Sequence, residues 1–191
     1  MFNNSPMNDD FMIAAIEGNA ADDIKRILAD PRKLFLTQVD GKWKSTGYSM
    51  EIFRRLQVNE IWFEEHQEEP SKYVSKVVCE LQVEPDMANN EHYMHGACGA
   101  YLTDMCSNIV FLAHGMATNN PTPSVSQQIN TIYHSPASVG DRLRIVSTTM
   151  SVGERTMTAR IEIWNATRHR LVVSGLHTKM SPSTFSKKSR L

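Results

Sequence analysis

The chain has 191 residues, of which 21% are charged and 41% hydrophobic, and its formal net charge is −1. This length and balance exclude a disordered or fibrous protein and predict one globular domain with a sizeable core plus an extension. No apolar run reaches the length of a membrane span. The basic residues are too dispersed, and too little interleaved with aromatic residues, to indicate a nucleic-acid-binding surface.

The distribution of charge and the cysteine content further restrict which kind of protein this is. Residues 1–92 carry 17 acidic and 10 basic side chains, a net of −7, whereas residues 93–191 carry 4 and 10, a net of +6. Either the two halves attract each other, or the basic half faces the phosphates of a ligand. The acidic residues among the first thirty argue against a mitochondrial transit peptide. Cys79, Cys98 and Cys106 are odd in number and have apolar neighbours, which predicts reduced core thiols of an intracellular protein.

Residues 1–48 are expected to form a partly helical N-terminal extension without a chemical motif. Short helices are predicted over 11–17 and 20–29, and Pro31 ends the second. Ser49 can then cap a helix that carries Ile52, Phe53 and Leu56.

Residues 49–181 show the pattern of an α+β domain. The first strand is predicted where Val77, Cys79, Leu81 and Val83 alternate with other residues, ahead of Pro85. A helix that is apolar or small on nearly every side follows over 96–113, so it is expected to be buried. Four further strands, predicted as a meander, cover 125–134, 142–151, 155–164 and 170–180. Residues 182–191 are expected to be a flexible basic tail.

The most informative stretch is HGACGAYLTD, residues 95–104, which places His95 and Gly96 at the start of the buried helix. A helix N-terminus supplies free N–H groups and the positive end of the helix dipole, so the Gly96 N–H is a candidate oxyanion donor. Asp104 must be satisfied or useful there, because an unpaired buried charge is costly. It follows His95 by nine residues, about 13 Å along a helix. An antiparallel helix from a second copy would bring the two features together, which predicts a dimer with two composite sites.

These motifs, with PSVSQQINTIYHSP over 123–136 and SGLHTKM over 174–180, resemble those of the hotdog-fold acyl-CoA thioesterases. The small single-domain enzymes related to phenylacetate-pathway thioesterases and to the mammalian mitochondria-associated thioesterase are the most similar. The resemblance implies an antiparallel sheet curled round a central helix, and hydrolysis of acyl-CoA to free acid and coenzyme A with no cofactor and no metal. It also implies a homodimer or a dimer of dimers.

The resemblance carries roles onto individual residues. Gly96 matches the oxyanion glycine, Asp104 the catalytic carboxylate, Asn89 the loop asparagine that orients water or carbonyl, and Ser126 the serine that assists the attacking water. The remaining matched residues are expected to contact substrate, and they are Ala97, Tyr133, Ser151, Val152, Gly153, Glu154, Arg155 and Thr156. Two positions depart from the family pattern, because Ala97 and His92 stand where relatives have glycine.

Several alternatives stay open. Asp104 is interpreted either as catalytic or as a group paired inside a dimer interface, and His95 as a support for the start of the helix or as an acid–base group. Cys98, in the first turn of the helix, is an alternative nucleophile. The spacing of His92 and His95 occurs in some metal sites, but no further ligand completes it. A hotdog dehydratase or hydratase, or a weak acyl-thioester-binding protein, is the alternative function.

The chain ends in Ser189, Arg190 and Leu191, preceded by Lys187 and Lys188. A terminal Ser-Lys-Leu is a peroxisomal address, and this variant exchanges one cation for another. We therefore expect peroxisomal import through the import receptor, with a solvated basic tail on a cytoplasmic protein as the alternative.

Overall fold

The computed structural model describes residues 13–30, 36–39, 42–45, 47–121 and 123–182, and no side chain between 36 and 45. The proposed targeting residues Ser189, Arg190 and Leu191 lie outside the described residues, as does all but the first residue of the expected tail. Those two expectations stay predictions.

A six-stranded antiparallel sheet forms one layer of the domain, in the order β3-β4-β6-β7-β8-β5. The strands are β3 Gln57–Glu65, β4 Tyr73–Gln82, β5 Val125–Tyr133, β6 Arg142–Val152, β7 Thr156–Asn165 and β8 Arg170–Met180. Alternate residues of β4, β6, β7 and β8 turn a hydrophobic face to one side, as the alternation in the sequence predicts.

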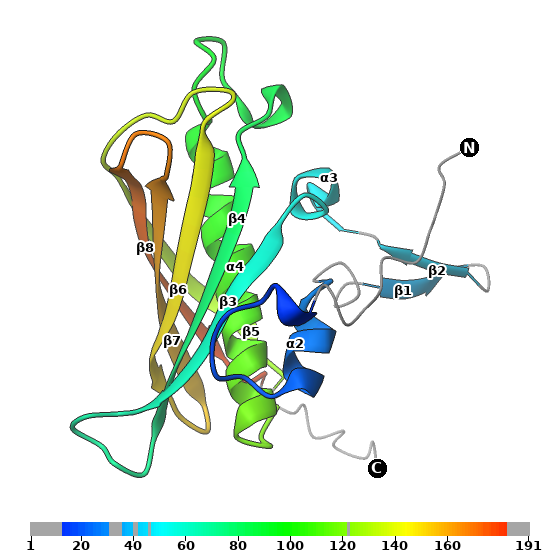
Figure 1. The fold of residues 1–191 in the computed structure, drawn as a ribbon, viewed down its shortest axis with the longest axis vertical. Helices are drawn as coiled ribbons and strands as arrows, with labels where there is room; N and C mark the ends of the chain where they lie inside the picture. The colour runs from blue at the N-terminus through cyan, green and yellow to red at the C-terminus, as the bar shows by residue number, and fades with distance from the viewer. Residues whose placement is uncertain (1–12, 31–35, 40–41, 46, 122, 183–191) are drawn as a thin grey trace, which may run out of the picture.

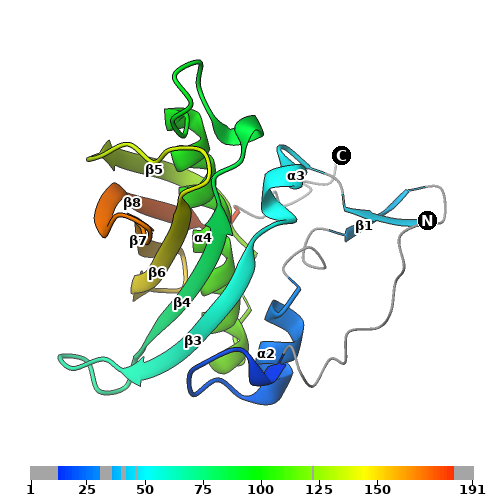
Figure 2. The same ribbon diagram turned by 45° about the horizontal axis from the view of Figure 1, so that its top comes forward.

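Helix α4, Gly96–Ala117, lies along that face and contacts all six strands (Figures 1 and 2). Leu102, Cys106 and Ile109 are fully buried against the sheet. The helix can approach β8 closely because residue 175 is glycine: a Cβ there would come within 2.7 Å of the Thr103 methyl carbon. The long buried helix expected over 96–113 is therefore confirmed and extends one turn further.

The N-terminal part covers the other side of α4 and one sheet edge. Helix α2, Asp22–Leu28, buries Ile24 and Leu28 and packs against α4. Of the helix expected over 11–17, Ile13 and Ala14 are helical, but Glu17 pairs with β3 instead. The Glu17 N–H bonds the Asn59 carbonyl over 2.8 Å, and its carbonyl accepts from the Ile61 N–H over 2.9 Å. Beyond α3, Met50–Phe53, lies the separate hairpin of β1, Leu36–Val39, and β2, Lys42–Ser45 (Figure 1).

The α+β class is confirmed, but three details of the sequence interpretation are wrong. Strand β3 was not among the predicted strands. Strand β5 was expected beside β6, yet it pairs with β8 and forms the far edge of the sheet. Ser49 does precede α3, but at φ 50° its hydroxyl makes no cap; its carbonyl instead accepts the Tyr101 hydroxyl over 3.0 Å.

The uneven charge along the chain is partly explained by contacts between strands. Arg144 of β6 lies 2.9 Å from the Glu60 carboxylate of β3, and Arg142 lies 3.9 Å from the Glu80 carboxylate of β4. These ion pairs join the basic half of the chain to the acidic half. Among the helices in the described ranges, none has both the length and the apolar character needed to cross a membrane.

Candidate active site

The N-terminus of α4 leaves one backbone donor free. His95 is the N-cap residue, and its Nδ1 accepts the Ala97 N–H over 3.0 Å. The Cys98 N–H bonds the His95 carbonyl over 2.9 Å. Within the described ranges, the Gly96 N–H has no hydrogen-bond partner. Gly96 therefore presents the donor that a developing oxyanion needs, whereas the Ala97 N–H is already occupied by the imidazole.

Asn89 holds the loop that leads into this helix. Its Oδ1 accepts the N–H groups of Glu91, over 3.0 Å, and Tyr93, over 3.1 Å. With the carbonyl oxygen occupied, the exposed side chain offers its Nδ2 as a donor. His92, which replaces the usual glycine, adopts φ 62°, so the loop keeps the left-handed conformation that glycine favours.

Tyr133, at the end of β5, contacts the same helix terminus. Its hydroxyl donates to the Gly96 carbonyl over 2.7 Å. The ring also packs on Gly99, where a Cβ would stand 3.2 Å from the ring carbon Cε1. Tyr133 therefore has a structural contact as well as an exposed surface, with half of its area accessible.

Asp104 stands away from this terminus, eight residues further along α4, or about 12 Å along the axis. Its side chain is 36% exposed. Asn108 Nδ2 donates to its Oδ1 over 3.2 Å, and His177 Nδ1 lies 3.6 Å from the same oxygen. Asp104 and Gly96 of one chain therefore lie apart, and their spacing along the sequence predicted this separation.

Buried polar residues around Asp104 were not found by sequence reasoning. Ser107 Oγ donates to the Asp104 carbonyl over 2.6 Å and lies 2.6 Å from His177 Nδ1. Lys179 Nζ donates to Asn108 Oδ1. Burial lowers the pKa of His177, which Asp104 opposes and Lys179 reinforces. Burial likewise lowers the pKa of Lys179, and Asp104 opposes that shift. The available signal was His177 and Lys179 alternating with residues of the exposed face in SGLHTKM.

Ser126 lies at the Asp104 end of the sheet. It pairs with Lys179 across β5 and β8, and opposed residues of an antiparallel pair share one face. Val125 pairs with Met180, which pairs in turn with Thr156. The expected substrate hairpin, residues 151–156, therefore begins at the same end of the sheet.

That hairpin borders a hollow of about 280 Å³. Ser151, Val152, Gly153 and Glu154 line it together with Lys72 of the β3–β4 connection. The turn is closed by the Gly153 N–H bonding the Thr156 carbonyl over 2.9 Å.

Cys98 is poorly suited to act as a nucleophile. Burial, together with the charge of Asp86, raises its pKa to about 11, and Arg55 only partly offsets this. Cys79, Cys98 and Cys106 are all free and buried. His92 and His95 belong to no group of three or more metal-binding side chains within the described part of the chain.

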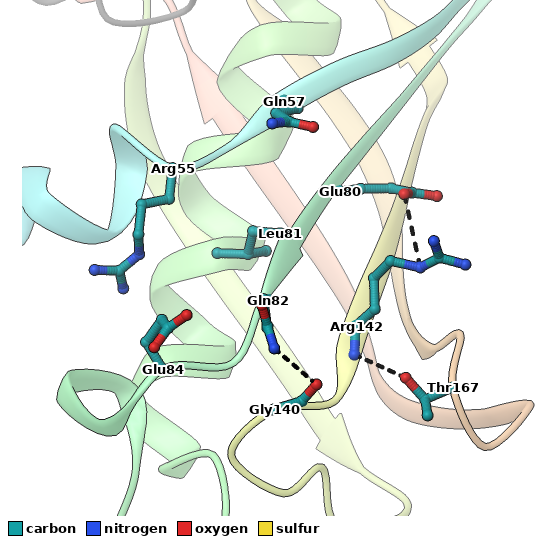
Figure 3. Close-up of a pocket in the computed structure, with 9 residues that line it drawn as sticks. All are labelled: Arg55, Gln57, Glu80, Leu81, Gln82, Glu84, Gly140, Arg142 and Thr167. Carbon is teal, nitrogen blue, oxygen red and sulfur yellow. Dashed lines mark hydrogen bonds and ion pairs between the residues drawn. The ribbon is translucent and has the colours of Figure 1, made fainter.

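A larger hollow, of about 580 Å³, lies away from all of these residues (Figure 3). It sits between the start of β3, the end of β4 and the start of β6, and the Glu80–Arg142 ion pair and the Gln82–Gly140 hydrogen bond cross it. None of the expected site residues lines it. The arginines that line it are paired, Arg142 with Glu80 and Arg55 with Asp86.

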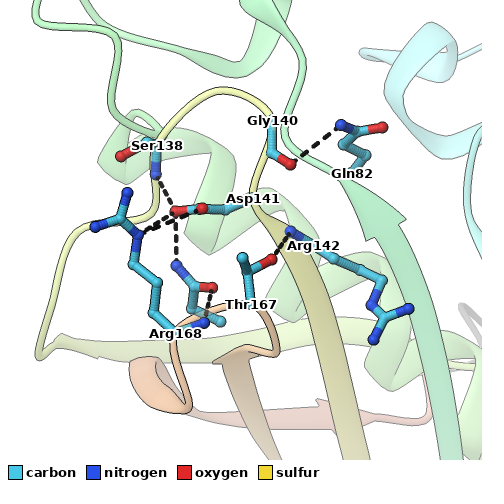
Figure 4. Close-up of polar contacts among 8 residues, drawn as sticks. Gln82, Ser138, Gly140, Asp141, Arg142, Thr167 and Arg168 are labelled. Atoms are coloured by element: carbon cyan, nitrogen blue, oxygen red, sulfur yellow. Dashed lines mark hydrogen bonds and ion pairs between the residues drawn. The ribbon is translucent and has the colours of Figure 1, made fainter.

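Asp141 is held by several donors, and its role is structural (Figure 4). It is 6% exposed and accepts the Ser138 N–H and Asn165 Nδ2, each over 2.8 Å, with Arg168 Nε 3.3 Å away. Burial opposes ionisation, yet these donors lower the pKa of Asp141 below its usual value. The cluster joins the loop before β6 to the β7–β8 turn.

An antiparallel sheet packed round one long helix is the architecture of the hotdog fold. Zebrafish thioesterase superfamily member 2 superposes with a TM-score of 0.58 at 23% identity, covering 72% of this chain and 88% of that one. A hypothetical thioesterase from Streptococcus pneumoniae, determined with coenzyme A, superposes with a TM-score of 0.57 at 19% identity, covering 70% and 91%. The expected hotdog fold is confirmed.

Sequence similarity identifies the family. The thioesterase superfamily model matches residues 91–172. Acyl-coenzyme A thioesterase 13 of Mus musculus is 32% identical over 104 residues, 54% of this chain and 71% of the relative. The Homo sapiens protein of the same name is 31% identical over the same shares. The chain belongs to the thioesterase superfamily.

Proposed function

We propose that this protein hydrolyses acyl-coenzyme A thioesters to a free acid and coenzyme A, at sites composed of residues from two copies of the chain. The observation that carries the proposal is that one helix bears both a Gly96 N–H without a hydrogen-bond partner and, further along, the hydrogen-bonded carboxylate of Asp104. Membership of the thioesterase superfamily and the similarity to acyl-coenzyme A thioesterase 13 support the same chemistry.

The edge strand β5 supports a dimer. Every residue of Val125–Tyr133 except Thr131 is exposed, and Ile129 and Ile132 are among the exposed apolar side chains. An uncovered edge with free N–H and C=O groups readily pairs with another strand. Antiparallel pairing of β5 with its copy would put the Tyr133–Gly96 end of one chain beside the Ser126–Asp104 end of the other. Each dimer would then hold two complete sites.

The proposed chemistry assigns a role to each end. Gly96 N–H and Asn89 Nδ2 of one copy donate to the thioester oxygen, where negative charge develops. Asp104 of the other copy takes a proton from water as the water oxygen attacks the carbonyl carbon, or attacks that carbon itself. The Ser126 hydroxyl assists the attacking water. The C–S bond then breaks, and coenzyme A leaves as the thiolate. Where Asp104 itself has attacked, water then hydrolyses the acyl–Asp104 anhydride, which releases the free acid and restores the carboxylate.

Coenzyme A is proposed to bind at the β6–β7 hairpin. The turn over 151–156 borders a hollow that is also lined by Lys72, which is ion-paired with Glu69, and Arg155 adds a second cation in the exposed turn. Cations of this kind suit the phosphates of the ligand. The Streptococcus pneumoniae neighbour was determined with coenzyme A, which supports the ligand class.

Release of free thiol from a panel of acyl-CoAs tests the reaction, and light scattering at the same concentration tests the assembly. A hydratase would add water to an enoyl thioester without releasing thiol, and a binding protein would release none. An active monomer would contradict the composite site.

Mixed dimers provide a sharper test of the two-copy site. Asn89→Ala removes a donor from one end and Asp104→Asn removes the carboxylate from the other. Unfolded and refolded together, the two inactive variants should form hybrids with one intact site, so activity should return. If each half-site worked within its own chain, mixing would restore nothing.

A further inference from the structure

A chain of polar contacts connects Asp104 to a buried cation. Lys179 Nζ bonds Asn108 Oδ1, while Asn108 Nδ2 donates to Asp104 Oδ1 over 3.2 Å and to the Asp104 carbonyl over 2.8 Å. Lys179 is only 7% exposed, and an ammonium group is rarely buried without compensation. We propose that Lys179 and Asn108 are positioning residues for Asp104: the amide orients the carboxylate, and the buried ammonium group faces it through that amide. This inference rests on the proposed function, which makes Asp104 the base or nucleophile.

The chemistry of the three groups determines how the Asn108 amide must face. An ammonium group has only donors and a carboxylate only acceptors. The amide carbonyl therefore faces Lys179 and the NH₂ group faces Asp104. A flipped amide would place its NH₂ donors against the ammonium donors and its carbonyl oxygen against the carboxylate oxygens. Ordered in this way, the amide dipole adds to the field of the cation at Asp104.

A second contact holds the main chain at Asp104 without adding charge. Ser107 Oγ donates its proton to the main-chain carbonyl of Asp104, so the same Oγ accepts from the His177 Nδ1–H. His177 Nε2 is then unprotonated, and it is buried with no hydrogen-bond partner among the described residues. Burial lowers the pKa of His177, which keeps the ring neutral at neutral pH. Lys179 is therefore the cation available to stabilise the carboxylate.

No other described group that faces Asp104 supplies a positive charge. On β8 the titratable groups are His177 and Lys179, and on α4 the nearby group is Tyr101, whose pKa burial raises to about 12. Strand β5 presents Ser126 and Ile129 on that face, opposite Lys179 and His177, and neither titrates. In the proposed dimer, His95 of a second copy would join them, and it is the same in every variant below.

Substitution at position 179 tests the role of the cation. Lys179→Met removes the charge, Lys179→Gln also removes it but keeps a donor for Asn108, and Lys179→Arg keeps the charge. In pH profiles of kcat, the acid limb of the Met and Gln variants should move about one pH unit upward, the usual effect of losing a nearby opposite charge. KM should change little, and the Arg variant should restore the limb. Lys76→Met, which removes a half-exposed cation on β4, should leave it unmoved.

A second readout needs no turnover. The Asn108 NH₂ contacts the Asp104 carboxylate, so its amide resonances should shift as that carboxylate is protonated. The pH midpoint of this shift should rise in Lys179→Gln and Lys179→Met and should be unchanged in Lys76→Met. In Asp104→Asn the shift itself should disappear. If the wild type hydrolyses no acyl-CoA, the proposed function fails, and this titration alone decides the inference. Equal midpoints in wild type and folded Lys179→Gln would overturn it, as would an unmoved acid limb.

Discussion

The Tyr133 hydroxyl donates a 2.7 Å hydrogen bond to the Gly96 carbonyl, which ties the end of strand β5 to the first turn of helix α4. The bond matters because Gly96 carries the free N–H of that turn. If β5 also pairs with a second copy, Tyr133 connects the dimer interface to the proposed oxyanion donor.

Tyr133→Phe removes this bond and keeps the ring packed on Gly99. The exposed hydrogen bond contributes about 1 kcal/mol to stability, so the variant should fold with a slightly lower Tm. If Tyr133 acts by positioning Gly96, kcat should fall about tenfold, the effect of 1.4 kcal/mol on the barrier, while KM stays close to that of wild type. A raised KM at unchanged kcat would instead indicate direct contact with the ligand. Steady-state kinetics with one acyl-CoA separates the two outcomes.

The helices and strands that the sequence predicted are those in which buried residues recur with a regular period. Helix α4 was evident because apolar and small residues cover it, and β8 because Val173, Gly175 and His177 alternate with exposed residues. Strand β3 was missed because a bulge between Val58 and Glu60 interrupts its alternation. The three acidic residues of QVNEIWFEE and its exposed end also dilute the strand signal.

Contacts between distant segments explain the other misses. The meander was predicted because the four strands follow one another along the chain, and nothing local shows that β5 pairs with β8 instead of β6. The contact of Asp104 with His177 spans more than seventy positions, so no spacing motif could report it. A lysine on the buried face of β8 was the available clue, because a buried cation needs a partner.

Cys98 should be dispensable for turnover. Its thiol is buried, and its pKa of about 11 keeps it protonated at neutral pH. Cys98→Ala should therefore retain kcat within a few-fold, and alkylation by iodoacetamide at pH 7 should be slow in the native protein. Comparison with the denatured protein controls for reagent quality. Loss of activity in folded Cys98→Ala would restore the cysteine as a candidate nucleophile.

Asp141 should make the fold sensitive to acid. Its pKa is lower in the folded protein than in the unfolded chain, so its stabilisation is present above the unfolded value of about 3.9 and is lost as pH falls through the folded value. Asp141→Asn should lower the free energy of unfolding by about 3 kcal/mol at pH 7, because it weakens a buried charged network. Urea unfolding at pH 7 and near pH 3 measures this.

The difference between wild type and Asp141→Asn should shrink at the lower pH. A control, Glu154→Gln in the exposed hairpin, should change stability little at either pH. A constant difference between wild type and Asp141→Asn across the two pH values would mean that Asp141 stabilises the fold by shape rather than by charge.

Asp104→Asn tests the chemical step most directly. The amide is nearly isosteric, and its Oδ1 still accepts from Asn108 Nδ2, so folding and assembly should survive. It removes the charge that, in the proposed mechanism, activates water or attacks the thioester. We therefore expect kcat to fall by about 10²–10⁴-fold, the usual effect of losing a positioned acid or base. KM should change much less, because the lost interaction belongs to the transition state.

Ser126→Ala is the matched comparison on the same face of the site. It should lower kcat by less than Asp104→Asn, since water can partly replace one exposed hydroxyl beside Lys179. Both variants should keep the circular dichroism spectrum and the molecular mass of the wild type. Near wild-type turnover in Asp104→Asn would show that the carboxylate is a structural group of the interface. The greater loss at Asp104 would instead show that hydrolysis depends on its charge, because the two substitutions alter side chains at the same end of the site.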